Sequence, residues 1–250
     1  MNEGTDMRLK EILSNVFDML EKASEVDPKG VVLTGYHEID QLTGGLKPGE
    51  LSLILTGEEG LGRTFAENVI LNHLDLSILV FCLDISKEQY GMELLSIKSQ
   101  VSFDAIRLVT IDQADWDKLS RATDDLSISN IQIIDKKDIT IRQIRTEIEK
   151  ANKNEPLNLI VIDIAENDYK ASRLKTLSKT LNIPIVLVSD SNICSSKMIE
   201  CADLVFELDD AWKLGCIAAV EVGVSKNTWG LTGMVGLNYS EEFTRFKSMN

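Results

Sequence analysis

The sequence predicts a three-layer α/β fold built on a mostly parallel sheet. Short apolar runs, typical of buried strands, alternate with amphipathic stretches, typical of helices, over most of the chain. The last part instead carries alternating residues and glycines, which favour antiparallel strands at one edge of the sheet. With 250 residues, of which 44% are hydrophobic, the chain can bury one large core.

The elements of this fold are predicted from the positions of the runs. The expected parallel strands are residues 51–55, 78–83, 131–134, 159–164, 183–188 and 204–208. The expected helices between them are residues 65–73, 85–99, 140–153 and 170–181. The expected antiparallel edge strands are residues 215–224 and 233–239.

An amphipathic helix is predicted ahead of this domain, at residues 7–24. Its apolar residues recur at helical spacing: Leu9, Ile12, Leu13, Val16, Phe17 and Leu20. The sequence Asp27-Pro28-Lys29-Gly30 then breaks the helix. We therefore expect a linker-like helix in residues 1–27 and an α/β domain in residues 28–250. The apolar stripe can pack on its own domain or on another subunit, and the sequence leaves both open.

The acidic charge balance bears on possible partners. The formal net charge is −14 and the sequence pI is about 4.6. Since neutralisation of phosphates supplies most non-specific affinity for nucleic acids, we expect weak or absent nucleic-acid binding. A charge of this sign is equally compatible with a role in keeping the protein soluble.

Cysteine spacing and hydropathy narrow the class of protein further. The four cysteines show no CxxC spacing, so a zinc site is not expected, and they are interpreted as small buried apolar residues in a reducing compartment. No apolar run approaches the roughly 18 residues of a membrane span, and the N-terminus lacks an apolar signal core. The sequence therefore predicts a cytoplasmic protein with no membrane partner.

The motif with the clearest chemistry is a phosphate-binding loop. The strand at residues 51–55 runs into Gly57-Glu58-Glu59-Gly60-Leu61-Gly62-Arg63-Thr64, and a helix follows. Strand, loop and helix are the context in which such a loop wraps phosphate with backbone N–H groups. Thr64 is the expected magnesium ligand. Taken without this context, the same residues would equally suit an ordinary glycine-rich turn.

Two departures weaken this loop. Arg63 stands where the motif has lysine, and its planar fork cannot bridge the outer phosphates as a compact ammonium does. Glu58 and Glu59 place two carboxylates in the segment that approaches phosphate, where salt screens them little. We expect weak binding of ATP or ADP with magnesium and impaired hydrolysis, although outward-pointing carboxylates would still permit a bound nucleotide.

The order of motifs resembles the C-terminal RecA-like motor domain of DnaB-type replicative helicases. The resemblance begins with Thr34-Gly35-Tyr36 through Asp40, and continues with the run from Leu42 to Glu50 just before the phosphate loop. It includes Leu83 to Gln89, the strand ending in Asp163, and the closing Thr244-Arg245-Phe246, and so covers nearly the whole chain. It implies a RecA-like P-loop fold preceded by the linker helix that docks on a neighbouring subunit.

The resemblance also assigns roles, and several of the residues in those roles are replaced. Asp163 matches the aspartate that reaches magnesium, whereas Asp84 stands for the glutamate that activates water. Lys226 matches the family's trans-acting hairpin, but Thr228 stands for its arginine finger. Asp190 stands where the family has a glutamine that senses nucleotide. The loops that contact single-stranded DNA in the family look short here, as in residues 164–168.

Three functions remain open on these grounds. The first is a hydrolysis-impaired helicase paralogue of DNA replication or recombination. It would be kept for self-association or for binding a replication protein such as a helicase, through the N-terminal helix. The second is a divergent but active ATP-dependent helicase or DNA-stimulated ATPase that uses Arg63 and Asp84. The third is an ATP-binding switch of the KaiC or RadA kind. The replaced residues favour the first, since they fall on the chemistry while residues 34–50 keep the scaffold motifs.

Overall fold

The computed structural model describes residues 30–57, 60–163, 169–214 and 217–249, together with Leu9 and Leu13. The chain divides into two units, residues 1–30 and residues 31–250. In the first unit Leu9 and Leu13 are helical, and the rest of the predicted amphipathic helix lies outside the described residues. The second unit carries the predicted α/β fold.

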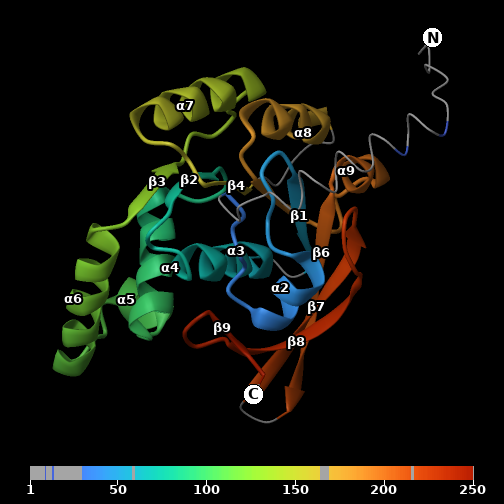
Figure 1. Cartoon of the computed structure of the whole chain (residues 1–250). Coiled ribbons are helices and arrows are strands. Elements are labelled where there is room, and N and C mark those ends of the chain that lie inside the picture. The colour runs from blue at the N-terminus through green and yellow to red at the C-terminus, as the bar shows by residue number, and fades with distance from the viewer. Residues whose placement is uncertain are drawn as a thin grey trace. The chain divides into compact units, whose positions relative to one another are not determined.

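The described strands form one nine-stranded sheet in the order β3-β2-β4-β5-β1-β6-β7-β8-β9 (Figure 1). Strands β1 to β6 pair in parallel, and β7, β8 and β9 add to β6 as antiparallel strands. The bounds are β1 Leu51–Thr56, β2 Ser77–Cys82, β3 Asn130–Ile134, β4 Leu159–Asp163, β5 Ile185–Asp190, β6 Leu204–Leu214, β7 Ile217–Asn227, β8 Gly233–Ser240 and β9 Arg245–Ser248. The mostly parallel sheet with antiparallel edge strands is therefore confirmed.

Helices lie on both faces of the sheet, with α7 and α8 on one side and α3 and α4 on the other (Figure 1). The bounds are α2 His37–Thr43, α3 Leu61–Leu71, α4 Lys87–Ser99, α5 Phe103–Leu108, α6 Gln113–Ser127, α7 Ile141–Asn154, α8 Tyr169–Leu181 and α9 Ser196–Cys201. The four helices that sequence periodicity predicts are present, and α2, α5, α6 and α9 are additions to that set. Among the described residues, no helix is both long and apolar enough to cross a membrane.

Two hydrophobic cores explain why the parallel strands are continuous apolar runs. In β1, Ile54 faces the core formed with α3 and α4, whereas Leu53 and Leu55 face the core formed with α7 and α8. Successive side chains of a strand point to opposite faces, so a strand covered on both sides needs apolar residues at every position. The central strand β1 is thereby fixed in position, and the phosphate loop leaves from its carboxyl end.

Part of the family-like motif before the phosphate loop has a structural role. The Asp40 carboxylate in α2 accepts hydrogen bonds from Thr34 N at 2.7 Å, Thr34 Oγ1 at 2.8 Å and Gly35 N at 3.1 Å. Gly35 has φ +85°, and a Cβ there would lie 2.3 Å from Asn72 Nδ2. The Thr-Gly pair and the later aspartate therefore close the turn into α2, because this backbone needs glycine and a fixed acceptor.

The cysteines are more exposed than the sequence suggests. Cys82 is buried in β2, but Cys194 and Cys201 are only partly buried, beside the core that contains α7 and α8. Cys82 and Cys201 are free thiols. Cys216 lies outside the described residues.

Candidate nucleotide site

The parallel register brings several predicted site residues together at the carboxyl ends of the strands. Thr56 at the end of β1 pairs with Asp190 of β5, and Cys82 at the end of β2 pairs with Asp163 of β4. In open α/β sheets, ligands bind beyond the carboxyl ends of the strands. The phosphate loop, Asp163 and Asp190 therefore meet where a ligand of this fold class is expected.

The glycines of the phosphate loop meet specific backbone requirements. Gly60 has φ +84° and caps the start of α3, and Thr64 N donates to Gly60 O at 2.9 Å. A Cβ at Gly62 would lie 3.0 Å from Thr56 Cγ2 and 3.1 Å from Val188 Cγ1, so α3 approaches β1 and β5 too closely for a side chain. The described part of the loop thus has the expected form, while Glu58 and Glu59 lie outside the described residues.

Arg63 is held by carboxylates of its own chain. Its Nη1 donates to Asp163 Oδ2 at 2.9 Å, and its Nε lies 3.3 Å from Glu93 Oε2. The Arg63 side chain is 16% exposed, and those of Asp163 and Glu93 are 10% and 14% exposed. Buried pairs are screened by salt much less than surface pairs, so these contacts restrain the guanidinium.

A third carboxyl group lies close by, one helical turn after Arg63. Glu67 is fully buried, and no described residue donates a hydrogen bond to either of its oxygens, so Glu67 bonds to the neighbouring Glu93 through its own proton. Burial raises the pKa of Glu67 well above its usual range, and the neighbouring Glu93 adds to the rise. Glu93 is itself fixed by Gln89, whose Nε2 donates to Glu93 Oε1 at 3.1 Å. Arg63 is therefore the cation at the centre of an acidic cluster, which we define as Asp163, Glu93 and Glu67.

Asp163 and Thr64 are the predicted magnesium ligands, and their present contacts differ. Thr64 lines the pocket described below, whereas one oxygen of Asp163 is already paired with Arg63. Burial raises the pKa of Asp163, and Arg63 offsets part of that rise. With the guanidinium in this place, the donor set does not fit a magnesium ion held through Asp163.

Two other predicted site residues, Asp84 and Asp190, also follow or end strands on this side of the sheet. Asp84 is exposed just after β2, close enough to raise the pKa of Asp163. Asp190 Oδ1 accepts hydrogen bonds from Asn192 N at 2.7 Å and Asn192 Nδ2 at 2.9 Å, so this carboxylate closes the turn after β5. The predicted short DNA loop at residues 164–168 lies outside the described residues.

A pocket of about 200 Å³ opens between the phosphate loop and the end of the chain. It is lined by Gly60, Leu61, Arg63, Thr64, Glu93, Phe103, Tyr239 and Thr244. The Thr244 hydroxyl is buried without a hydrogen-bond partner among the described residues, and Thr244 has φ +47°. Backbone strain and an unpaired polar group are both typical of functional sites. The pocket therefore combines phosphate-loop backbone, one cation and aromatic walls.

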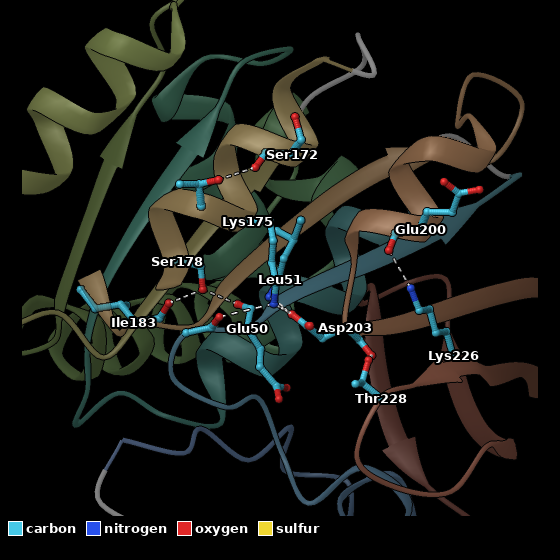
Figure 2. Close-up of polar contacts among 12 residues, drawn as sticks. Glu50, Leu51, Ser172, Lys175, Ser178, Ile183, Glu200, Asp203, Lys226 and Thr228 are labelled. Atoms are coloured by element: carbon cyan, nitrogen blue, oxygen red, sulfur yellow. Dashed lines mark hydrogen bonds and ion pairs between the residues drawn. The ribbon is translucent and has the colours of Figure 1, made fainter. Parts of the chain in front are cut away.

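Lys226 and Thr228 lie at the amino-terminal ends of the parallel strands, opposite the phosphate loop, because the end of β7 pairs with the start of β6. Lys226 Nζ donates to Ile199 O and Glu200 O, both at 2.9 Å, at the carboxyl end of α9 (Figure 2). Thr228 Oγ1 donates to Asp203 O at 2.9 Å. Within one chain, Lys226 bonds to the end of α9 and Thr228 bonds to Asp203, away from the phosphate loop. Their assignment to a contact with a neighbouring subunit stays a prediction.

A second set of polar contacts stabilises the amino-terminal ends of these strands (Figure 2). Asp203 Oδ2 accepts from Leu51 N at 2.8 Å and pairs with Lys175 of α8. Ser178 Oγ donates to Glu50 O at 2.7 Å. These bonds attach α8 to the start of β1, and so set the position from which the phosphate loop leaves at the other end.

Sequence reasoning identifies only part of the site. The loop motif and the strand end predict Arg63, Thr64 and Asp163, but they do not predict Glu93 or Tyr239. Both arrive from distant elements through packing, which no local pattern reports. Glu67 had a usable signal, since a charged residue four positions after Arg63 falls on the face of α3 that also carries apolar residues.

Comparisons with known proteins identify the family to which the chain belongs. A family model described as the DnaB-like helicase C-terminal domain matches residues 31–197. The replicative DNA helicase DnaC of Bacillus subtilis is 25% identical across 99% of this chain, which covers 63% of that protein. The replicative DNA helicase DnaB of Synechocystis is 28% identical across 72% of this chain, which covers 23% of that protein. The chain thus spans less than two thirds of these relatives.

Solved structures support the fold. One of them, described as an ATPase domain, superposes with a TM-score of 0.79 at 21% identity, over 98% of this chain and 100% of that one. A DnaB-like replicative helicase, described with its interactions with primase, gives a TM-score of 0.82 at 20% identity, over 98% of this chain and 68% of that one. Because the family model matches more than half of the sequence and the RecA-like fold agrees with it, the chain belongs to the DnaB-like helicase C-terminal domain family.

Proposed function

We propose that this chain is a hydrolysis-impaired relative of replicative DNA helicases that acts in DNA replication or recombination through assembly. The observation that carries the proposal is the ion pairing of Arg63 with Asp163 and Glu93. In phosphate-loop ATPases the loop lysine and a magnesium ion neutralise the charge that develops on the outer phosphates. Here the cation of the loop is committed to carboxylates of its own chain.

The other positions that correspond to catalytic residues of the family also favour impaired hydrolysis. Asp84 is a carboxylate one methylene shorter than the family's glutamate, and such a displacement from the attacking water slows proton transfer. Thr228 has no charge to place on a phosphate of a neighbouring subunit, and its hydroxyl donates to Asp203. Each change acts on a different part of the reaction, so together they favour loss of turnover over a change of substrate.

Assembly is proposed from the family and from one surface. The solved helicase named with primase shows a partner class for that protein, and we extend it here to self-association or a replication protein. The turn between β7 and β8 exposes Trp229 and Leu231, which are 61% and 68% exposed. The turn is held in place, since Asn227 Nδ2 donates to Leu42 O and Leu231 O. A fixed apolar tip at the position of the family's trans-acting hairpin is suited to contact a second copy.

The test of impaired hydrolysis is an ATPase assay with and without single-stranded DNA, run beside Asp163→Asn. We expect the native chain and this variant to have the same background turnover. DNA-stimulated turnover that Asp163→Asn abolishes would show a working motor and end the proposal.

Assembly is tested separately, by light scattering after size-exclusion chromatography. We expect a mass above that of one chain, and a lower mass for the double variant Trp229→Ala and Leu231→Ser. Ile128→Ser, at a residue that is 86% exposed on another element, is the matched control and should leave the mass unchanged. A native chain that is monomeric at all concentrations, with and without a replicative helicase present, would contradict assembly.

A second candidate function is a nucleotide-binding switch without turnover. The pocket beside Gly60 and Thr64 favours it, because phosphate-loop backbone and an aromatic wall persist there. Calorimetry with ATP tests this candidate, since the switch requires binding: absence of binding would exclude the switch and leave assembly untouched.

A further inference from the structure

We propose that Arg63 takes the place of the magnesium ion in this site, so that the pocket binds a metal-free nucleoside di- or triphosphate. The inference deepens the proposed function and rests on it for the identity of the site. The ligand class follows from a phosphate loop and a cation that the chain itself supplies.

The Asp163 carboxylate is already paired with Arg63. The resemblance implies that this aspartate reaches a magnesium ion through water, but Asp163 Oδ2 is 2.9 Å from Arg63 Nη1 in a contact that is nearly buried. A divalent ion and its water brought to this carboxylate would face a permanently charged guanidinium at short range. Like charges in a poorly solvated site repel strongly, so either Arg63 leaves or the ion does not enter.

Arg63 is restrained from leaving this place. Its Nε lies 3.3 Å from Glu93 Oε2, so two carboxylates on different elements, β4 and α4, hold the same guanidinium. Displacement would leave the nearly buried carboxylates of Asp163 and Glu93 without their cation, beside the fully buried Glu67. The acidic cluster therefore favours Arg63 in its present place.

The remaining guanidinium nitrogen of Arg63, Nη2, is directed to the phosphate loop. A Cβ placed on Gly60 would lie 3.7 Å from Arg63 Nη2, so this nitrogen faces the phosphate loop. Arg63 also lines the pocket, together with Gly60 and Thr64. A guanidinium has donors on three nitrogens, and it can bind carboxylate on one side and phosphate on the other. A bridge between Asp163 and phosphate is the geometric task that a magnesium ion would otherwise perform.

The test is calorimetry of the full chain with ADP and with ATP, once in excess magnesium chloride and once in excess EDTA. We expect dissociation constants that agree within a few-fold in the two buffers. Binding about tenfold or more tighter in magnesium, lost on Asp163→Asn, would overturn the proposal. Absence of binding in both buffers would also overturn it, whereas the proposed loss of turnover and the assembly would be untouched by that result.

Variants at position 63 test the bridge itself. Arg63→Lys supplies a single point charge that cannot contact Asp163 and Glu93 as a fork does, so its binding should become magnesium-dependent. Arg63→Gln should lose binding in EDTA, and circular dichroism would check its fold. Arg145→Gln is the matched control, since Arg145 pairs with Glu149 on the exposed face of α7. If Arg63→Lys bound equally in both buffers, Arg63 would not be what replaces the ion.

Discussion

At the scale of single residues, Glu67 combines complete burial with ionisable chemistry. No described residue donates a hydrogen bond to either of its oxygens, and its pKa is raised well above the ordinary 4.5, first by burial and then by Glu93. The folded chain therefore holds the Glu67 proton more tightly than the unfolded chain does. This contribution to stability is fully present below about pH 4.5 and is lost as the pH rises towards the folded pKa.

We predict that Glu67→Gln stabilises the protein more at pH 8 than at pH 5. The amide cannot ionise, so the variant's gain in unfolding free energy should be about 1 to 3 kcal/mol larger at pH 8 than at pH 5, since one pKa unit between folded and unfolded states is worth about 1.4 kcal/mol. Urea denaturation at both pH values measures the difference. Glu242→Gln, at an exposed position, should show no change that depends on pH. An equal effect of Glu67→Gln at both values would mean that Glu67 does not titrate differently on folding.

At the scale of elements, Asn68 joins the first helix of the site to the last strand of the chain. Its Nδ2 donates to Thr64 O at 2.8 Å and Thr244 O at 3.0 Å, and its Oδ1 accepts from Phe246 N at 3.1 Å. Phe246 also packs edge-on against Phe65 of α3, with ring centroids 5.6 Å apart. One buried amide thus connects α3 with β9, and with the Thr244 wall of the pocket.

We predict that Asn68→Ala lowers the unfolding free energy by about 2 to 3 kcal/mol, since it leaves buried backbone groups unpaired. Hydrogen exchange should show faster exchange of the Phe246 amide, whose acceptor is removed. Asn192→Ala is the control, because the Asn192 side chain is exposed and, among the described residues, bonds to Asp190 within its own turn. Unchanged exchange at Phe246 would show that β9 is held by packing rather than by Asn68.

The elements also show where sequence patterns succeed. Parallel strands such as β1 and β2 are predictable because both faces are buried and nearly every residue is apolar. Helix α6 is not, because only Leu119 and Ala122 are buried, Trp116 is exposed, and most of its other residues are polar. Short α9 lacks the two turns that periodicity needs. Sequence patterns thus indicate burial, and elements with few buried residues are not predicted from them.

At the scale of the whole molecule, the net charge of −14 opposes contact with nucleic acid. We predict no binding of an oligothymidine by fluorescence anisotropy at about 150 mM salt with Kd tighter than about 100 µM, the weak end of non-specific binding. A replicative helicase serves as the positive control. A micromolar Kd that weakens steeply with salt would instead reveal a basic surface strong enough to overcome the overall charge.

In the candidate site, too, features that depend on local sequence are predictable, and contacts that depend on tertiary packing are not. The phosphate loop is predictable because its glycines meet local requirements, as Gly60 does with φ +84° at the start of α3. The pairing of Arg63 is not, since Glu93 reaches it only after α4 packs beside α3. The sequence shows that the lysine is replaced, but the fold is needed to show what the replacement contacts.

The acidic cluster around Arg63 also bears on how position 63 tolerates substitution. Lysine at this position would leave Asp163 and Glu93 facing a smaller cation that cannot contact both as a fork does. Such a change would match the loop motif more closely while it weakens the contacts of the interior. We expect a stable protein with lysine here to need coordinated changes on α3 and α4, so positions 63, 67 and 93 should vary together rather than one at a time.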